Sequence, residues 1–229
     1  MLLGARQFFE KRGGGWQNPY ITDGLIAMWD GEWPGGVGGQ TAQSASEWVD
    51  LIHGNIYGSG TGILYDATHK CFDLNKIGRS DAARFSVGGT LGSWDGFSVE
   101  VVFEGTFATA TYRNLMSFGG YNPVGVGLSD MKISPLGSSN YVNGLPLDTP
   151  IGCAFTITGG VGNNKAYVKG ELSVTGNPPN FQMSYVGAPD QSANNVSGKI
   201  YALRIYSRVL TAAEIAANNA IDQARFNLP

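Results

Sequence analysis

The sequence predicts an all-β fold: a two-sheet antiparallel jelly-roll sandwich with a short C-terminal helix. Of its 229 residues, 34 are Gly and 10 are Pro, and only 14% are charged, which is typical of short strands joined by tight turns. Turn-forming stretches such as GGYNP, GGVGNN and GNPPN recur about every ten residues, as in antiparallel sandwiches. Strands and helices do not alternate along the chain, which argues against a parallel sheet.

The clearest strand signal is the FSVEVVF stretch at residues 97–103. Every second residue from Phe97 onward is apolar, while the intervening Ser98 and Glu100 are polar, so we expect one face on the core and one in water. Residues 25–30 are apolar in both phases, which predicts a strand covered on both sides. Further strands are predicted over residues 114–118, 124–128, 131–133, 151–158, 165–168, 181–186 and 199–206.

One helix is predicted near the C-terminal end. Thr211 and Glu214 have the spacing of a capping box, and Arg225 suits the negative end of the helix dipole. Helical spacing predicts an apolar face made of Leu210, Ala213, Ala217, Ile221 and Ala224, with Ile215 and Phe226 on another face. Two apolar faces predict contacts with the sandwich and with either an adjacent loop or a partner.

The chain is predicted to divide into a leader or docking segment, residues 1–19, and a sandwich domain, residues 20–229. Apolar residues between Leu2 and Phe9 have the spacing of a short helix face, and a run of three Gly follows. Two interpretations stay open: a frayed tail, or a docking peptide, chiefly residues 1–15, that orders on a capsid or tail protein. The leader lacks the apolar region and cleavage site of a classical signal peptide.

Charge and cysteine usage exclude several classes of protein. The net charge is −3 and the Lys and Arg residues are scattered, so no basic stripe is available for nucleic acid. No apolar run approaches the roughly 20 residues of a membrane span. Cys71 and Cys153 have neither metal-ligand nor CxxC spacing. Because Cys153 alternates in phase with Ile151 and Phe155, a buried free thiol is favoured over a disulfide.

Five segments together carry a family resemblance. GKIYALRIYSRVLTAAEIAANNAIDQARF at residues 198–226 resembles the closing strand and terminal helix of the concanavalin A-like or laminin G-like superfamily of lectins and glucanases. The other four segments resemble its opening strand, a Trp-Asp turn, a central strand and a hairpin: DGLIAMWDGE at 23–32, WVDLIHGNIYG at 48–58, FSVEVVFEG at 97–105 and NKAYVKGEL at 164–172. The resemblance implies the sandwich fold for residues 20–226.

The family's glucanases carry acidic residues that this sequence lacks. They place them on one strand in a Glu-x-Asp-x-x-Glu or related pattern, because retaining hydrolysis needs an acid and a nucleophile about 5 Å apart. The nearest pairs here, Glu100 with Glu104 and Glu47 with Asp50, are interpreted as surface charges. The two histidines lie outside any Ser-His-Asp or HExxH pattern. No enzymatic activity and no cofactor are predicted.

The resemblance also bears on metal binding, because laminin G-like proteins often hold Ca²⁺ at one rim through Asp, Asn and main-chain oxygens. The oxygen donors available for such a site are Asp30, Asp50, Asp130, Asp190 and Asn194. They form no tight Asp-x-Asp cluster, and Tyr201 stands where many relatives carry an acidic residue early in the closing strand. No metal site is therefore predicted.

Glycan recognition usually combines an aromatic face with neighbouring amides or carboxylates. Several loop aromatics have polar neighbours, and residues 189–195 add donors and acceptors. The candidate glycan-binding residues are Trp33, Tyr121, Asn122, Tyr141, Asp190 and Asn194. The other four tryptophans flank apolar strands and are assigned to core or edge packing.

The two ends of the sequence indicate where the protein acts. The AIDQARF ending and the MLLGAR opening resemble proteins of gut bacteria and their phages, and a phage protein released by lysis needs no signal peptide. We expect a non-enzymatic phage virion protein of decoration, head-fibre or tail-fibre type, displayed on the virion surface and contacting host glycans. The alternatives are a bacterial carbohydrate-binding or adhesion lectin at the cell surface and, with less support, a glycan-active hydrolase. Each non-enzymatic role is compatible with a homo-oligomer.

Overall fold

The structure is a computed structural model of the whole chain. It describes residues 18–31, 48–52, 56–57, 64–73, 84–86, 96–106, 113–118, 121–126, 131–133, 142–158, 163–176, 183–187 and 198–229. In several strands, only the main chain is described. Residues 1–17 of the predicted leader lie outside the described residues, so the division of the chain near residue 20 stays a prediction.

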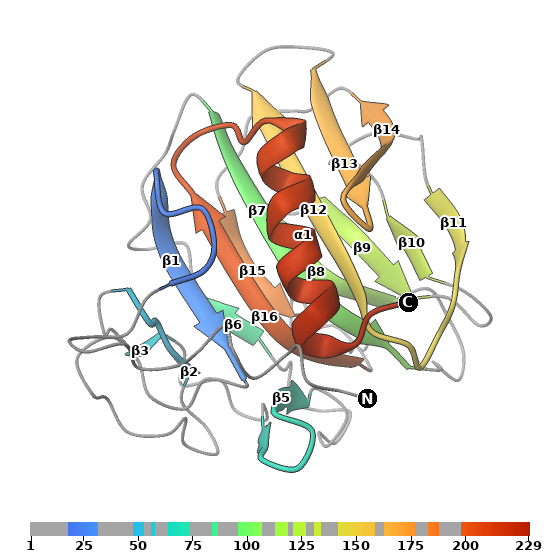
Figure 1. Cartoon of the computed structure of the whole chain (residues 1–229). Helices are drawn as coiled ribbons and strands as arrows, with labels where there is room; N and C mark the ends of the chain where they lie inside the picture. The colour runs from blue at the N-terminus through green and yellow to red at the C-terminus, as the bar shows by residue number, and fades with distance from the viewer. Residues whose placement is uncertain are drawn as a thin grey trace, which may run out of the picture.

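Two antiparallel sheets face each other (Figure 1). The larger sheet has the order β14 (Glu171–Gly176), β13 (Asn164–Val168), β12 (Ile151–Thr158), β7 (Gly96–Gly105), β16 (Gly198–Tyr206), β5 (Cys71–Asp73), β4 (Leu64–Asp66), and β1 (Leu25–Asp30) also pairs with β16. The six-stranded sheet has the order β11 (Val142–Leu145), β10 (Met131–Ile133), β9 (Tyr121–Val126), β8 (Arg113–Phe118), β15 (Met183–Gly187), β6 (Arg84–Ser86). Strands β2 (Trp48–Val49) and β3 (Ile56–Tyr57) form a small hairpin.

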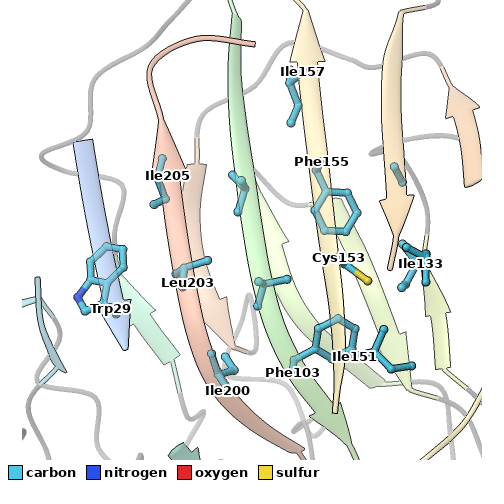
Figure 2. Packing of buried hydrophobic residues seen from close by; sticks show 14 of the residues in the cluster. Trp29, Phe103, Ile133, Ile151, Cys153, Phe155, Ile157, Ile200, Leu203 and Ile205 are labelled. Atoms are coloured by element: carbon cyan, nitrogen blue, oxygen red, sulfur yellow. The ribbon is translucent and has the colours of Figure 1, made fainter. Parts of the chain in front are cut away.

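The hydrophobic core lies between the two sheets. Alternate residues of β12, from Ile151 to Ile157, point into it (Figure 2). Alternate residues of β7, from Phe97 to Phe103, belong to the same cluster. Met131 and Ile133 meet them from the six-stranded sheet. This shared core confirms the predicted antiparallel sandwich, because each sheet buries one apolar face against the other.

Both cysteines are buried free thiols, as predicted for Cys153. Cys153 lies in the core, and its burial raises the pKa of its thiol far above the usual range. Burial, and after it the negative charge of Asp66, raises the pKa of the Cys71 thiol to about 12. Neither thiol is therefore a reactive thiolate at neutral pH.

Helix α1 (Ala212–Phe226) packs across the outer face of the eight-stranded sheet (Figure 1). Its capping box is present as predicted: Glu214 N donates to Thr211 Oγ1 at 3.2 Å, and Thr211 N donates to Glu214 Oε2 at 2.8 Å. Of the predicted apolar face, Leu210 is buried and Ile221 is half-buried, but the prediction is wrong for Ala213, Ala217 and Ala224, which are exposed. The buried positions of the helix are Ile215, Asn218, Asn219 and Asp222.

The predicted solvent-facing side of β7 is also wrong. Ser98 and Glu100 do point away from the core, but both are buried, along with the whole strand from Phe97 to Gly105. The reason is that α1 covers this face of the sheet, so its polar residues meet a polar helix face rather than water. Alternation alone identifies two different faces but does not reveal what covers the second one.

Most predicted strands are confirmed, with small shifts at their ends; the 151–158 prediction agrees with β12 at both ends. The strand predictions from alternation missed β11, β14 and the short strands β2 to β6, although the resemblance implied a hairpin over residues 164–172, where β13 meets the start of β14. Strand β14 carries a largely exposed ELSVTG stretch at the sheet edge, so it lacks the apolar alternation on which the strand predictions depended. Tyr121 and Asn122, predicted in a loop, lie in β9.

Candidate functional site

The most concentrated chemistry in the described part of the chain is an ion network between α1 and the sheet. Arg204 on β16 is 1% exposed and lies opposite Glu100 on β7 in the strand register. Its Nε donates to Glu100 Oε2 at 2.9 Å, and its Nη1 donates to Asp222 Oδ1 of α1 at 2.9 Å. A further hydrogen bond joins Arg204 Nη2 to Asp222 Oδ2. One guanidinium thus joins two strands and the helix.

A second ion pair extends this network to β1 and the N-terminal segment. Arg225 Nη1 and Nη2 donate to the two carboxylate oxygens of Asp30, at 2.6 and 2.9 Å. Tyr20 OH donates to Asp222 Oδ1 at 2.7 Å and accepts from Arg225. The Arg204 guanidinium also stacks on the Tyr20 ring, 3.9 Å from its centroid.

Asn218 of α1 completes the contacts with the sheet. Its Nδ2 donates to Glu100 Oε2 at 2.8 Å and to Tyr206 OH at 3.0 Å, while its Oδ1 accepts from Ile21 N at 3.0 Å. The network contains two guanidiniums, of Arg204 and Arg225, and three carboxyl groups. The amide and hydroxyl donors therefore stabilise the buried carboxyl oxygens by hydrogen bonds, without adding charge.

Burial dominates the electrostatics of this network. It raises the pKa of Glu100 even though the Arg204 guanidinium acts in the opposite direction, and it raises the pKa of Asp30 against the effect of Arg225. Burial lowers the pKa of Arg204, but Asp222 and Glu100 outweigh it and hold that pKa well above the usual value. The guanidinium therefore stays charged at every pH at which the protein is folded.

The space beside this network is very small. A cavity of about 10 Å³ is lined by Glu100, Arg204, Asn219 and Asp222 together with Gly152 and Gly170. This volume holds about one water molecule, and Glu100 is only 3% exposed. The network serves to seat the helix on the sheet.

Two glycines allow the helix to lie this close. A Cβ atom at Gly152 would lie 2.7 Å from Asn219 Oδ1. A Cβ atom at Gly170 would lie 3.2 Å from the Asn219 Cβ, and Gly170 also has a positive φ of 80°, which disfavours a larger residue. Side-chain size on β12 and in the β13–β14 turn thus fixes where α1 sits.

A second polar group lies near the start of β16. Glu104 accepts from Lys199 Nζ at 2.8 Å and from Tyr201 OH at 2.7 Å. Burial, followed by the Glu104 contact, raises the pKa of Tyr201 above the usual range. Tyr201 therefore works as a hydrogen-bond donor to a carboxylate.

The interpretation of the acidic pairs as surface charges is wrong for three of the four residues. Glu100 and Glu104 are 3% and 6% exposed because α1 and the ends of the neighbouring strands cover them. Asp50 is also buried, and its Oδ1 accepts from the main-chain nitrogens of Met28 and Ile52 at 2.9 and 3.0 Å. Glu47 lies outside the described residues.

The predicted glycan-binding residues are not brought together in the described part of the chain. Trp33, Tyr141, Asp190 and Asn194 lie outside it. Tyr121 and Asn122 lie in β9, where only the main chain is described. The predicted glycan site therefore stays a prediction.

Among the described residues, no group of three or more His, Cys, Asp and Glu side chains is placed to hold a metal ion. Asp30 binds Arg225 and Asp50 binds main-chain nitrogens, whereas Asp130, Asp190 and Asn194 lie outside the described residues. His69 contacts Asp66 in the turn between β4 and β5. No described helix is long and apolar enough to cross a membrane.

Sequence reasoning missed the ion network itself. Its signals were two charged residues, Glu100 and Arg204, inside otherwise apolar strands, and Asn218 and Asp222 at i, i+4 spacing on the helix. Polar residues at that spacing share a face. A polar strand face and a polar helix face each suggest exposure when read separately, although here they pack against each other.

Comparison with known proteins shows similarity in structure only. No family model and no curated protein matches the sequence. Trypanosoma rangeli sialidase in complex with sialic acid matches with a TM-score of 0.66 and 14% identity, covering 88% of this chain and 34% of the sialidase chain. The binding domain of botulinum neurotoxin serotype G matches with a TM-score of 0.55 and 13% identity, covering 77% of this chain and 49% of that one.

A further match is the binding domain of botulinum neurotoxin DC in complex with rat synaptotagmin II. It has a TM-score of 0.57 and 12% identity, and the match covers 89% of this chain and 52% of that domain. At these identities the likeness shows the fold alone. This chain spans about a third of the sialidase and half of each toxin domain, so the activities of those whole proteins are not carried over.

The ion network predicts a large cost for removing one of its partners. Replacing Asp222 by Ala leaves the buried Arg204 guanidinium without its main counter-ion, which we expect to lower the free energy of unfolding by about 3–5 kcal/mol. Urea unfolding of the variant measures this loss. The matched control is Gln223→Ala on the exposed side of the same helix, expected to change stability by about 0.5 kcal/mol or less. Equal effects of the two substitutions would contradict the assigned role.

The contacts of Glu214 at the start of α1 predict that the free energy of unfolding changes with pH in acid. Hydrogen bonds from Arg208, and then from Thr211, lower the pKa of Glu214 from 4.5 to about 2. The unfolded chain therefore takes up the proton first, and this stabilisation is lost as the pH falls from 4.5 towards 2. Burial raises the pKa of Glu100, so protonation of Glu100 has the opposite effect on stability.

The measurement is the free energy of unfolding against pH for the unmodified chain and for Glu214→Gln. We expect the Gln variant to be less stable near neutral pH and the two curves to converge in acid. A constant difference between the curves down to pH 2 would show that Glu214 ionisation does not hold the helix start.

Proposed function

We propose that the chain is a non-enzymatic surface-binding module of the concanavalin A-like or laminin G-like lectin type, which contacts a cell-surface glycan. The observation that carries this proposal is the combination of its fold with the state of its acidic residues. Its structural neighbours include a sialidase solved with sialic acid and a toxin binding domain solved with rat synaptotagmin II. The described carboxylates nearest to a hydrolase pattern are occupied in internal ion pairs.

The non-enzymatic assignment is supported by the environment of Glu100 and Glu104. A retaining hydrolase needs two carboxyl groups about 5 Å apart that flank the scissile glycosidic bond of a bound sugar. Here Glu100 faces Arg204 and Asn218 beneath α1, and Glu104 faces Lys199 and Tyr201. Groups held in this way have a structural use.

The proposed ligand contacts are the sequence-predicted residues Trp33, Tyr121, Asn122, Tyr141, Asp190 and Asn194. They combine aromatic rings with amides and carboxylates, the chemistry that binds the apolar face and the hydroxyls of a pyranose. Helix α1 covers the central part of the outer face of the eight-stranded sheet. Ligand contact is therefore assigned to other surfaces.

A glycan array tests this function. We expect the purified chain to bind a defined set of glycans, with Trp33→Ala and Tyr121→Ala each weakening binding by removing an aromatic contact. Parallel arrays with and without Ca²⁺ determine whether a cation takes part. Gln223→Ala on α1 is the matched control. A blank array from folded protein would reject glycan binding, and release of reducing sugar would reject the non-enzymatic assignment.

The virion location is proposed from the resemblance of the two ends of the sequence to phage proteins. In this proposal, the chain is a decoration, head-fibre or tail-fibre component, and residues 1–15 bind a capsid or tail protein. Deleting residues 1–15 is expected to abolish incorporation into particles while the melting temperature of the sandwich stays unchanged. Co-sedimentation with particles measures incorporation. Unchanged incorporation would reject docking through the leader.

A further inference from the structure

Strand β11, one of the two edge strands of the described six-stranded sheet, contains an Asn-Gly pair at Asn143 and Gly144. It pairs with β10 on its other side. Asn143 and Gly144 are both exposed, whereas the flanking Val142 and Leu145 are half-buried against the core. The pair therefore reaches solvent while its neighbours hold the strand in place.

The main chain is irregular at this pair. Met131 lies opposite Leu145 and Ile133 lies opposite Val142, so two residues of β11 face the single residue Lys132. This arrangement is a β-bulge, which locally disrupts the ladder of a sheet. Gly144 has a φ of 76°, and a Cβ atom there would meet no atom within 4 Å. The surroundings of Gly144 are thus open on the side where a side chain would stand.

We propose that Asn143 is a site of spontaneous covalent modification, in which its amide converts to a carboxylate through a cyclic imide with Gly144. The Gly144 main-chain nitrogen loses its proton and attacks Cγ of Asn143, the bond from Cγ to Nδ2 breaks, and ammonia leaves. Water then opens the five-membered ring at either carbonyl. The net reaction consumes one water, releases one ammonia, and yields aspartate or isoaspartate.

Three features of this pair favour the reaction. The attacking and attacked atoms belong to adjacent residues, so ring formation is intramolecular and needs no bound partner. Gly144 carries no side chain to obstruct the approach, and Gly reaches unusual dihedral angles at little cost. Exposure of both residues gives water access to the ring.

The modification changes the sheet edge in two ways. Either product adds one negative charge to a chain whose net charge is −3. Isoaspartate also routes the main chain through the former side-chain carbon, which lengthens β11 by one atom between its two anchors, Val142 and Leu145. Because both anchors pack on the core, we expect the isoaspartate form to unfold more easily than the unmodified chain.

The chain contains its own controls for the test. Asn227 is exposed and has a positive φ of 51°, but Leu228 follows it. Asn164 and Asn218 are 1% and 0% exposed. Comparison with Asn227 separates the effect of the following Gly from exposure alone, and comparison with the other two residues measures the effect of burial.

The experiment incubates the folded chain in water labelled with oxygen-18 at mildly acidic and mildly alkaline pH, followed by peptide mass spectrometry. We expect label at Asn143 several-fold faster than at Asn227, little at Asn164 or Asn218, and a faster reaction in alkali because the attacking nitrogen must lose a proton. An isoaspartyl-directed methyltransferase independently reports the isoaspartate product.

Two variants complete the test. Asn143→Gln lengthens the side chain so that a five-membered ring cannot form, and it should abolish labelling at this position without unfolding the chain. Asn143→Asp carries the charge without the rearranged main chain, and it should retain most of the stability that the isoaspartate form loses. Labelling of Asn143 no faster than that of Asn227, or far slower in the folded chain than in denaturant, would overturn the proposal.

Discussion

The buried contact of Arg204 with Glu100 and Asp222 is the interaction on which the arrangement of the C-terminal helix depends. It joins β16, β7 and α1 through a single guanidinium that is 1% exposed. Moving three charges out of water costs desolvation free energy. The attraction between them offsets this cost only when the geometry is good and the remaining hydrogen-bonding groups are satisfied. Asn218 and Tyr20 complete them here by binding Glu100 and Asp222.

The contribution of this network is best understood as specificity of packing. An apolar helix face slides or rotates on an apolar sheet at little cost, whereas Asp222 meets Arg204 in only one position of α1. Gly152 and Gly170 impose the same position sterically, because Asn219 fills the space where their side chains would stand. Charge and shape therefore select the same position, and Tyr20 ties the N-terminal segment to it.

Features that depend on residues close together in the sequence were predictable, whereas features that depend on contacts between distant residues were not. The core strands and the capping box of Thr211 and Glu214 were predictable, because alternation and capping are local patterns. The burial of Glu100 was not, because it depends on a helix more than a hundred residues later in the chain. The same limit applies to β14, whose exposed stretch is held by pairing with β13. The candidate glycan residues come from composition and turn chemistry, which indicate a kind of surface without bringing its members together.

The covered outer face has a consequence for where a ligand can bind. In an antiparallel sandwich each sheet has one face in the core, so ligands contact either the outer faces or the connecting loops. Here the helix occupies the central part of the outer face of the eight-stranded sheet, and the polar groups beneath it bind one another. We therefore expect recognition to come from other surfaces; of the proposed contacts, Tyr121 lies in β9 of the six-stranded sheet.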